Sequence, residues 1–275
     1  MIRRTTLAVA LAATLVLAAC GSDSDDDAAS TSTLEPTSTT AGIEPLTILV
    51  TNDDGIGAPG IDVLVTALQE LEEVELVVVA PAENQSGSSD TTTPGGAQHG
   101  AGQTASGVAG TAVQGFPADT IAVALDELGL QPDLVVSGVN QGQNVGPLAA
   151  ISGTLGAART ALRRGIPAVA SSAGLEALAD YELGAELVVT WIAEHRGEIA
   201  DGTIGANAVV SFNVPGCRIG EPKPLVEVPL AAAMPEGANP FETADCDIVL
   251  TGPPADDVAA MLGGHLAETL VPAEL

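Results

Sequence analysis

Short apolar runs alternate with amphipathic stretches along most of the chain. Runs rich in Val, Leu and Ile predict buried strands at Leu46–Val50, Leu76–Ala80, Leu134–Ser137, Ala168–Ala170 and Val209–Phe212. Apolar positions with a period of about 3.6 residues predict helices at Gly60–Leu68 after Pro59, Pro117–Leu128, Ser152–Arg164 and Ala177–His195. This alternation is typical of an α/β fold, with a mostly parallel sheet and helices on both faces.

The pattern weakens in two regions. Residues from Pro81 to about Gly110 are rich in Gly, Ser, Thr and Gln, and they predict a functional loop or flap because plain connections are shorter. Beyond Pro215 the chain breaks into short pieces, with a strand expected at Asp247–Leu250 and a helix at Asp256–Leu262. We therefore expect a less regular C-terminal extension.

The first 45 residues do not fit this fold. A basic start and an apolar stretch, Leu7–Leu17, lead to Cys20 in a pattern that resembles a bacterial lipoprotein signal. That reading places lipid on the Cys20 thiol and the protein outside the cytoplasm at a membrane; the alternatives are an ordinary secretory signal or an uncleaved anchor. Residues 21–45 lack apolar periodicity and predict a disordered tether. The expected organisation is a signal (1–20), a linker (21–45) and one α/β domain (46–275).

Charge and composition narrow the partners. The formal net charge is −28, and aromatic residues make up 2% of the chain. Such a surface repels nucleic-acid polymers and anionic headgroups, and it offers few aromatic rings for base stacking. Membrane contact is therefore expected through the lipid anchor alone. A small anionic substrate fits if a metal ion and backbone N–H groups supply positive potential.

Two cysteines remain after Cys20. Cys217 and Cys246 lie in loop-like surroundings, and an even number of cysteines in an exported chain predicts a disulfide. Two unpaired thiols are the alternative. A metal site is disfavoured because no second Cys or His lies at ligand spacing.

Asp53 and Asp54 directly follow the first predicted strand. Ligands bind at the carboxyl ends of strands in open α/β sheets, and two adjacent carboxylates favour a hard divalent cation such as Mg²⁺ or Mn²⁺. An acidic pair before Gly55 is also common in plain turns, so a turn without function is the alternative here.

Three further polar segments follow other predicted elements. Asn84–Ser89 offers small polar side chains, Gly138–Asn144 offers amide oxygens between glycines, and Ser152–Thr154 opens a helix whose N–H groups and dipole favour anions. Each also has a plain structural reading, as a loop, an Asn-Gly turn or an N-cap. Because parallel strands end at one sheet edge, we expect these segments to meet the acidic pair.

Several short blocks resemble the SurE family of survival-protein phosphatases. They are Ile48–Gly55, Ala58–Ile61, Val79–Pro81 with Asn84–Gly87, Gly115–Asp119, Pro132–Asn140 with Gly142 and Asn144, and Ile151–Ala158. The blocks follow the family order over about residues 46–172. The resemblance implies a Rossmann-like fold, a homo-oligomer (dimer or tetramer), and metal-dependent hydrolysis of nucleoside 5′-monophosphates, with 3′-nucleotides as a second substrate class and one Mg²⁺ or Mn²⁺ per subunit.

At matching positions, the resemblance assigns residues to roles. Asp53, Asp54, Ser86 and Asn140 would hold the metal, with the two aspartates as the catalytic pair, and Asn144, Ser152, Gly153 and Thr154 would bind the phosphate. Departures from the family pattern are Ala82–Glu83 in place of an Asp-Arg pair, Pro147–Ala150 in place of acidic residues, and a poorly matching C-terminal third. These departures put substrate choice and assembly in doubt.

Other readings fit less well. A receiver domain would place Lys223–Pro224 much nearer the acidic pair, and a haloacid-dehalogenase phosphatase needs Asp-x-Asp, whereas Asp53 and Asp54 are adjacent. The stronger alternative is a lipoprotein that binds a phosphorylated or metal-chelating ligand without turnover. No role is assigned to the three histidines, because an isolated His is more often structural or solvated.

Overall fold

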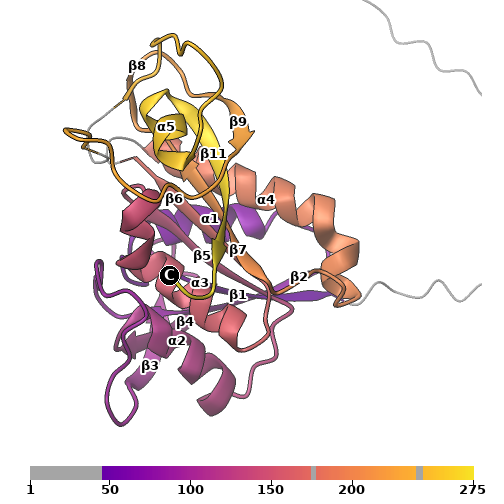
Figure 1. The fold of residues 1–275 in the computed structure, drawn as a ribbon. Helices are drawn as coiled ribbons and strands as arrows, with labels where there is room; N and C mark the ends of the chain where they lie inside the picture. Colours follow the sequence, from indigo (N-terminus) through magenta and orange to yellow (C-terminus); the bar gives the residue numbers. More distant parts are fainter. Residues whose placement is uncertain (1–44, 175–177, 240–243) are drawn as a thin grey trace, which may run out of the picture. The chain divides into compact units, whose positions relative to one another are not determined.

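One sheet forms the centre of the described chain (Figure 1). The computed structural model describes residues 45–174, 178–239 and 244–275, so the predicted signal, tether and lipid site at Cys20 lie outside the described residues. The sheet strands are β1 (Leu46–Thr51), β2 (Val74–Pro81), β3 (Gln98–Gln103), β4 (Ala109–Gln114), β5 (Leu134–Gln141), β6 (Ala168–Ala173), β7 (Ala208–Val214), β9 (Lys223–Glu227) and β11 (His265–Pro272). Their order is β3-β4-β2-β1-β5-β6-β7-β11-β9.

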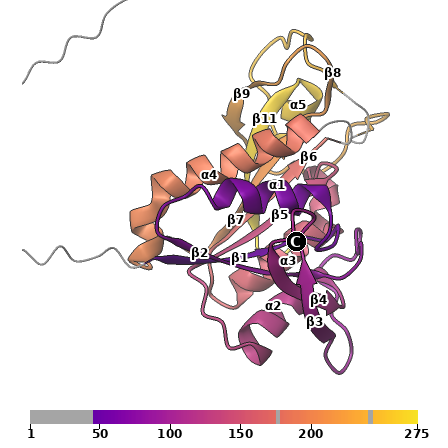
Figure 2. The same ribbon diagram turned by 180° about the vertical axis from the view of Figure 1, so that it is seen from behind.

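Helices cover both faces of this sheet, as the sequence predicts. On one face α1 (Pro59–Leu68) packs beside α4 (Leu178–Ala200), and Figure 2 shows this pair in front. On the other face lie α2 (Pro117–Ala122), continued by a π-helical turn (Val123–Glu127), and α3 (Gly153–Arg163). Among the described residues, no helix is both long and apolar enough to cross a bilayer.

Strand β1 is buried on both sides, which explains its nearly continuous apolar sequence. Successive side chains of a strand point to opposite faces. Ile48 and Val50 join the apolar cluster under α1 and α4, whereas Leu49 joins the cluster under α3. This two-sided burial fixes the strand in the middle of the fold.

The five strands β2, β1, β5, β6 and β7 are parallel, and β4 is parallel to β2. In register, Val50 lies opposite Val78 on one side and Val136 on the other. The segments that follow β1, β2 and β5 therefore leave the sheet at the same edge. This edge carries the candidate site.

Two regions differ from the predictions. The expected loop after Pro81 contains the antiparallel hairpin β3–β4, whose Gly- and Gln-rich sequence lacks apolar alternation. The expected strand at Asp247–Leu250 is wrong: the structure has no regular element there, and the carbonyl of Ile248 accepts from Lys223 Nζ instead of from a neighbouring strand.

The C-terminal extension is irregular, as expected, but it ends in the sheet. Strand β11 pairs antiparallel with β7, an element that the sequence reading did not foresee. The predicted helix forms as α5 (Asp257–Leu262). A separate two-stranded sheet is formed by β8 (Cys217–Ile219) and β10 (Ala244–Asp245). The Cys217–Cys246 disulfide links the first residue of β8 to the residue that follows β10.

Candidate functional site

The acidic pair follows β1 inside a tight turn. Asn52 closes this turn, because its side-chain amide donates to the Gly55 carbonyl at 2.9 Å and its oxygen accepts from the Gly55 N–H at 3.2 Å. Gly55 has φ of +104°, a conformation that side chains other than glycine rarely adopt. The backbone of this segment therefore forms the turn that the sequence offered as one alternative. The turn leaves both carboxylates free to contact other segments.

Asp54 is the meeting point of three loops. Its Oδ1 accepts from Asn84 Nδ2 at 3.1 Å and lies 3.5 Å from Ser86 Oγ. Its Oδ2 accepts from the backbone N–H of Gln141 at 2.9 Å. Asn84 and Ser86 follow β2, and Gln141 is the last residue of β5, so the expected convergence at one sheet edge is observed. Asn84 and the Gln141 amide had been given no role from the sequence.

Asp53 lies against the start of α3. Thr154 Oγ1 donates to Asp53 Oδ1 at 2.7 Å, and the Thr154 backbone N–H also points at this carboxylate. A Cβ on Gly153 would fall 2.7 Å from the Asp53 Cβ, so the approach requires glycine. The positive end of the α3 dipole is thereby directed at a buried anion.

Burial sets the electrostatics of the pair. Asp53 is 2% exposed, and burial raises its pKa from 3.8 to about 6. The hydrogen bond from Thr154 lowers that pKa, whereas the charge of Asp54 raises it further. Burial also raises the pKa of Asp54, against the lowering effect of its hydrogen bonds from Gln141, Ser86 and Asn84. Two carboxylates held this way gain from a cation beside them.

Asn140 supplies a neutral oxygen that fits such a cation. Its Nδ2 donates to the Gly142 carbonyl at 2.6 Å, and among the described residues its buried Oδ1 has no hydrogen-bond partner. A buried acceptor without a partner is costly, and a hard metal ion would satisfy it. Nowhere in the described chain do three His, Cys, Asp or Glu side chains gather around one point. The fitting donor set is instead two carboxylates with neutral oxygens from Asn140 and Ser86.

Three of the expected phosphate residues, Asn144, Ser152 and Thr154, already make hydrogen bonds within the protein. Ser152 Oγ accepts from the Leu155 N–H at 3.1 Å and caps α3, as in the plain N-cap reading. Asn144 donates to Thr154 Oγ1 at 3.3 Å and to Ser172 Oγ at 2.9 Å. The structure thus brings these side chains to the acidic pair, but the Thr154 hydroxyl serves Asp53. An anion at this place would meet the backbone N–H of Gly153 and the positive end of the α3 dipole, since the N–H groups of Thr154 and Leu155 are engaged with Asp53 and Ser152.

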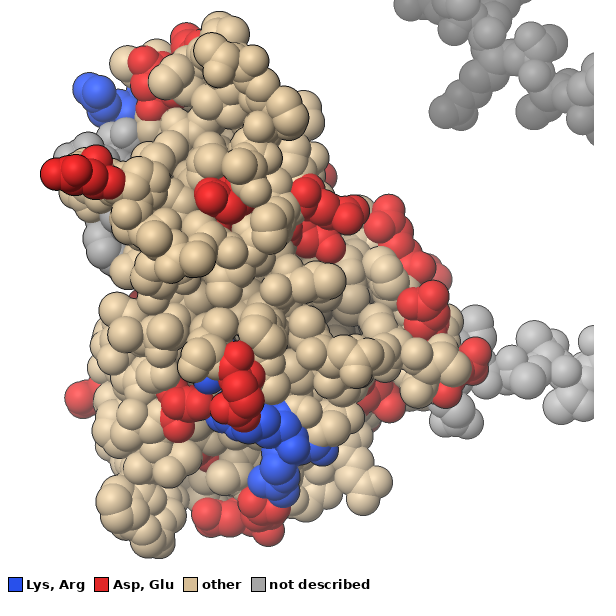
Figure 3. Space-filling model, viewed as in Figure 1, with Lys and Arg blue, Asp and Glu red and all other residues tan. Residues whose placement is uncertain are grey.

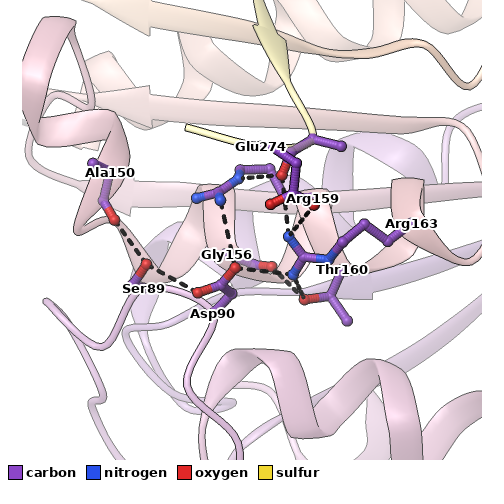
Figure 4. Close-up of polar contacts among 9 residues, drawn as sticks. Ser89, Asp90, Ala150, Gly156, Arg159, Thr160, Arg163 and Glu274 are labelled. Atoms are coloured by element: carbon purple, nitrogen blue, oxygen red, sulfur yellow. Dashed lines mark hydrogen bonds and ion pairs between the residues drawn. The ribbon is translucent and has the colours of Figure 1, made fainter.

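A second polar cluster fastens the Ser86 loop to α3 (Figure 4). Asp90 lies 3.4 Å from Arg159 Nη2 and 3.0 Å from Arg163 Nη2, and Arg159 Nε donates to the Ala273 carbonyl at 3.0 Å. Ser89 Oγ donates to the Ala150 carbonyl at 2.7 Å. Figure 3 shows acidic side chains spread over this face while most basic ones gather in one group. The sequence alone gave no reason to connect these residues.

The histidines have contacts elsewhere. His195 stacks on Trp191 with ring centroids 4.5 Å apart, His265 Nδ1 lies 3.0 Å from the Pro224 carbonyl, and His99 pairs with Glu127 at 3.2 Å. None of these contacts involves Asp53 or Asp54.

Comparison with known proteins identifies the family. The model of the family described as "Survival protein SurE" matches residues 48–234. This chain belongs to the SurE family. The match covers Asp53 and Asp54, Asn140 and Asn144, and the start of α3.

Individual SurE proteins are similar over different lengths. A "5'-nucleotidase SurE" of Halobacterium salinarum is 40% identical over 177 residues, 61% of this chain and 64% of that protein. One of Variovorax paradoxus is 34% identical over 234 residues, 81% of this chain and 90% of that protein. The crystal structure of the SurE protein from Aquifex aeolicus matches with a TM-score of 0.64 and 26% identity, over 83% of this chain and 94% of that one.

Proposed function

We propose that this chain is a divalent-metal-dependent phosphomonoester hydrolase that acts on nucleoside 5′-monophosphates. The observation that carries the proposal is the acidic pair, whose hydrogen-bond partners come from the loop after β2, the end of β5 and the start of α3 at one sheet edge. Family membership and relatives named 5′-nucleotidases support the same chemistry. As a family member the protein is also expected to form a dimer or tetramer.

In this proposal, Asp53, Asp54, Ser86 and Asn140 hold Mg²⁺ or Mn²⁺. A bound ion of this kind would polarise a phosphoryl oxygen and lower the pKa of a water molecule. The chain itself contributes orientation. Thr154 fixes the Asp53 carboxylate, and the Gln141 N–H fixes that of Asp54. Hydrolysis forms a bond from a water oxygen to phosphorus and breaks the bond to the nucleoside 5′-oxygen, which leaves with a proton.

The start of α3 and Asn144 would receive the phosphate. The backbone N–H of Gly153 and the positive end of the α3 dipole would favour an anion there, because the Thr154 N–H already points at Asp53 and the Leu155 N–H donates to Ser152. A substrate phosphate would draw the Asn144 amide away from Thr154, to which it is joined by the longer of its two hydrogen bonds, at 3.3 Å. Ser152 would keep its capping role and contribute through the turn that it stabilises.

The test is phosphate release from nucleoside 5′- and 3′-monophosphates and from an aryl phosphate, using the full chain with Mn²⁺ or Mg²⁺. Asp53→Asn should abolish release, whereas Asp126→Asn, which alters a surface carboxylate paired with Arg164, should keep it. Phosphate binding without any release would favour the non-catalytic lipoprotein instead. Full activity in Asp53→Asn would show that the site is misplaced.

We further propose that the protein is exported and held at a membrane by lipid on Cys20, as the N-terminal sequence resembles a lipoprotein signal. Replacing Cys20 by Ser should move the protein from the membrane fraction to the soluble fraction. An unchanged distribution would refute the anchor.

A further inference from the structure

Ser86 is the one exposed side chain among the four proposed metal ligands. Its hydroxyl lies 3.5 Å from Asp54 Oδ1, at the limit of a hydrogen bond. Its backbone N–H donates to the Asn84 side chain at 3.0 Å, which orders the turn only locally. The place of Ser86 beside Asp54 therefore depends on what holds the rest of its loop.

The loop is attached on both sides of Ser86. Before it, the Gln85 N–H donates to the Asp53 carbonyl at 2.7 Å and ties the loop to the turn after β1. After it, the Ser89 N–H donates to the Ile151 carbonyl at 3.1 Å. The second attachment joins the loop to the residues that lead into α3.

The loop backbone lies directly on α3 at this second attachment. A Cβ on Gly156 would fall 2.0 Å from the Ser89 carbonyl oxygen, so a side chain there would push the loop away. Ser89 has φ of +53°, which residues other than glycine seldom adopt. Such a conformation persists where the surrounding contacts enforce it. Hydrogen bonds of Ser89 and the ion pairs of Asp90 with α3 provide that enforcement.

Arg159 of α3 holds Asp90 from inside the protein (Figure 4). It is 4% exposed, and among the described residues it is the one basic side chain that is buried. Its Nη2 lies 3.4 Å from Asp90 Oδ2, and its Nε donates to the Ala273 carbonyl at 3.0 Å. Arg163 reaches the same two partners from the surface, at 3.0 Å and 3.1 Å. One planar guanidinium thus joins the Ser86 loop, α3 and the residue after β11.

Stability alone explains this cluster poorly. Desolvation of a buried ion pair offsets most of its attraction, so such a pair is weak evidence for a stabilising role. Arg159 also keeps Nη1 buried without a hydrogen-bond partner among the described residues, which adds to the cost. What the cluster does provide is a fixed position for Asp90, four residues beyond Ser86.

We propose that Arg159 is a positioning residue for the metal site, which through Asp90 holds Ser86 beside Asp54 in the metal-free protein. The inference rests on the proposed function, in which Ser86 is a metal ligand, and it gives a role to a side chain outside the site. A ligand that is already in place spares the metal the cost of ordering the loop. Because Arg159 also bonds to Ala273, the same side chain connects the C-terminal extension to the metal site.

Calorimetric titration of Mn²⁺ into the metal-free full chain tests this role without hydrolysis. Asp90→Ala frees the loop from Arg159 and should weaken Mn²⁺ binding about tenfold. Arg159→Lys keeps the charge but lacks the planar fork that serves Asp90 and Ala273 together, so it should weaken binding in the same direction. Asp126→Ala is the matched control, because it breaks an exposed pair with Arg164 and should leave Mn²⁺ binding unchanged.

A double variant separates positioning from a general loosening of the fold. Ser86→Ala removes the ligand itself and should weaken Mn²⁺ binding at least as much as Asp90→Ala. If Asp90 acts through Ser86, adding Asp90→Ala to Ser86→Ala should weaken binding by less than about twofold more. Independent effects would instead multiply to about a hundredfold, and that result would overturn the inference.

Phosphate release distinguishes failure of this inference from failure of the proposed function. In Asp90→Ala, saturating Mn²⁺ should restore most of the wild-type kcat for a nucleoside 5′-monophosphate, because only metal affinity is reduced. Wild-type Mn²⁺ affinity in both Asp90→Ala and Arg159→Lys would overturn the positioning role and leave the hydrolase standing. The expected losses of affinity without phosphate release from any variant or the wild type would sink the hydrolase and keep the positioning role. A wild-type chain that binds no Mn²⁺ would overturn both.

Discussion

Replacing Asp53 by Asn should stabilise the metal-free protein at neutral pH, although it removes a proposed metal ligand. The carboxylate is 2% exposed, and burial raises its pKa from 3.8 to about 6. The Asp53 carboxylate therefore binds a proton more tightly in the folded protein than in the unfolded chain. This contribution favours the folded state fully below about pH 3.8 and is lost as the pH rises through about 6.

The size of the effect follows from these two values. At about 1.4 kcal/mol for each pH unit, a pKa of about 6 against 3.8 makes ionised Asp53 cost about 3 kcal/mol of stability above pH 7. The variant has no such cost. The variant loses part of the hydrogen bonding from Thr154, which lowers its stability by about 1 kcal/mol. Its net gain in unfolding free energy near pH 8 is therefore about 2 kcal/mol.

Denaturant unfolding in the presence of a chelator, from about pH 4 to about pH 8, measures this difference. The stability of Asp53→Asn relative to wild type should rise by most of the 3 kcal/mol over that range. Asp126→Asn is the matched control: the Arg164 hydrogen bond lowers the pKa of Asp126 from 3.8, so the effect of this variant changes mainly below about pH 3.8 and should stay nearly constant from about pH 4 to about pH 8. A pH-independent difference for Asp53→Asn would refute the reasoning.

Two further predictions concern stability and use matched pairs. A Cβ on Gly60 would lie 1.9 Å from the Val139 carbonyl oxygen, so Gly60→Ala should cost about 3 kcal/mol or more of stability. A Cβ on Gly57 meets nothing within 4 Å, so Gly57→Ala should change stability little. Equal denaturation midpoints for the two variants would contradict this packing. Arg159→Met removes the cation that pairs with Asp90 in a buried cluster and should cost about 2–3 kcal/mol of stability. Arg164→Met removes an exposed ion pair with Asp126 and should cost less than about 1 kcal/mol. Thermal unfolding that ranks the two variants the other way would be evidence against the cluster.

The central sheet was predictable because its strands are buried on both faces. Continuous apolar runs such as Leu46–Val50 leave little choice of structure, and parallel strands bring their following loops to one edge. The meeting of Asp54 with Ser86 was therefore foreseeable. Strand β11 was not, because its alternating His265–Pro272 sequence follows an irregular stretch and pairs with β7 far earlier in the chain.

The details of the site depend on contacts that no local pattern encodes. The Thr154 hydroxyl donates to Asp53 across 101 residues, and the Asn144 backbone N–H donates to Asn213 Oδ1 across 69 residues. The residue pattern indicated the segments that contain Asn144 and Thr154, and the family resemblance assigned both residues to the phosphate, but neither could say which protein groups each one contacts. Asn213 ends a parallel strand at the same edge, so the edge rule could have suggested it.

The Cys217–Cys246 bond has a consequence for how such a protein can diversify. It closes a stretch with a sequence separation of 29, which contains β9 of the main sheet and none of β1, β5 and α3. The family match ends at residue 234, inside the same stretch. The disulfide holds the ends of this stretch together while its exposed residues change, because surface segments tolerate substitution. The sequence of the C-terminal third can then diverge while the strands that carry the acidic pair keep theirs.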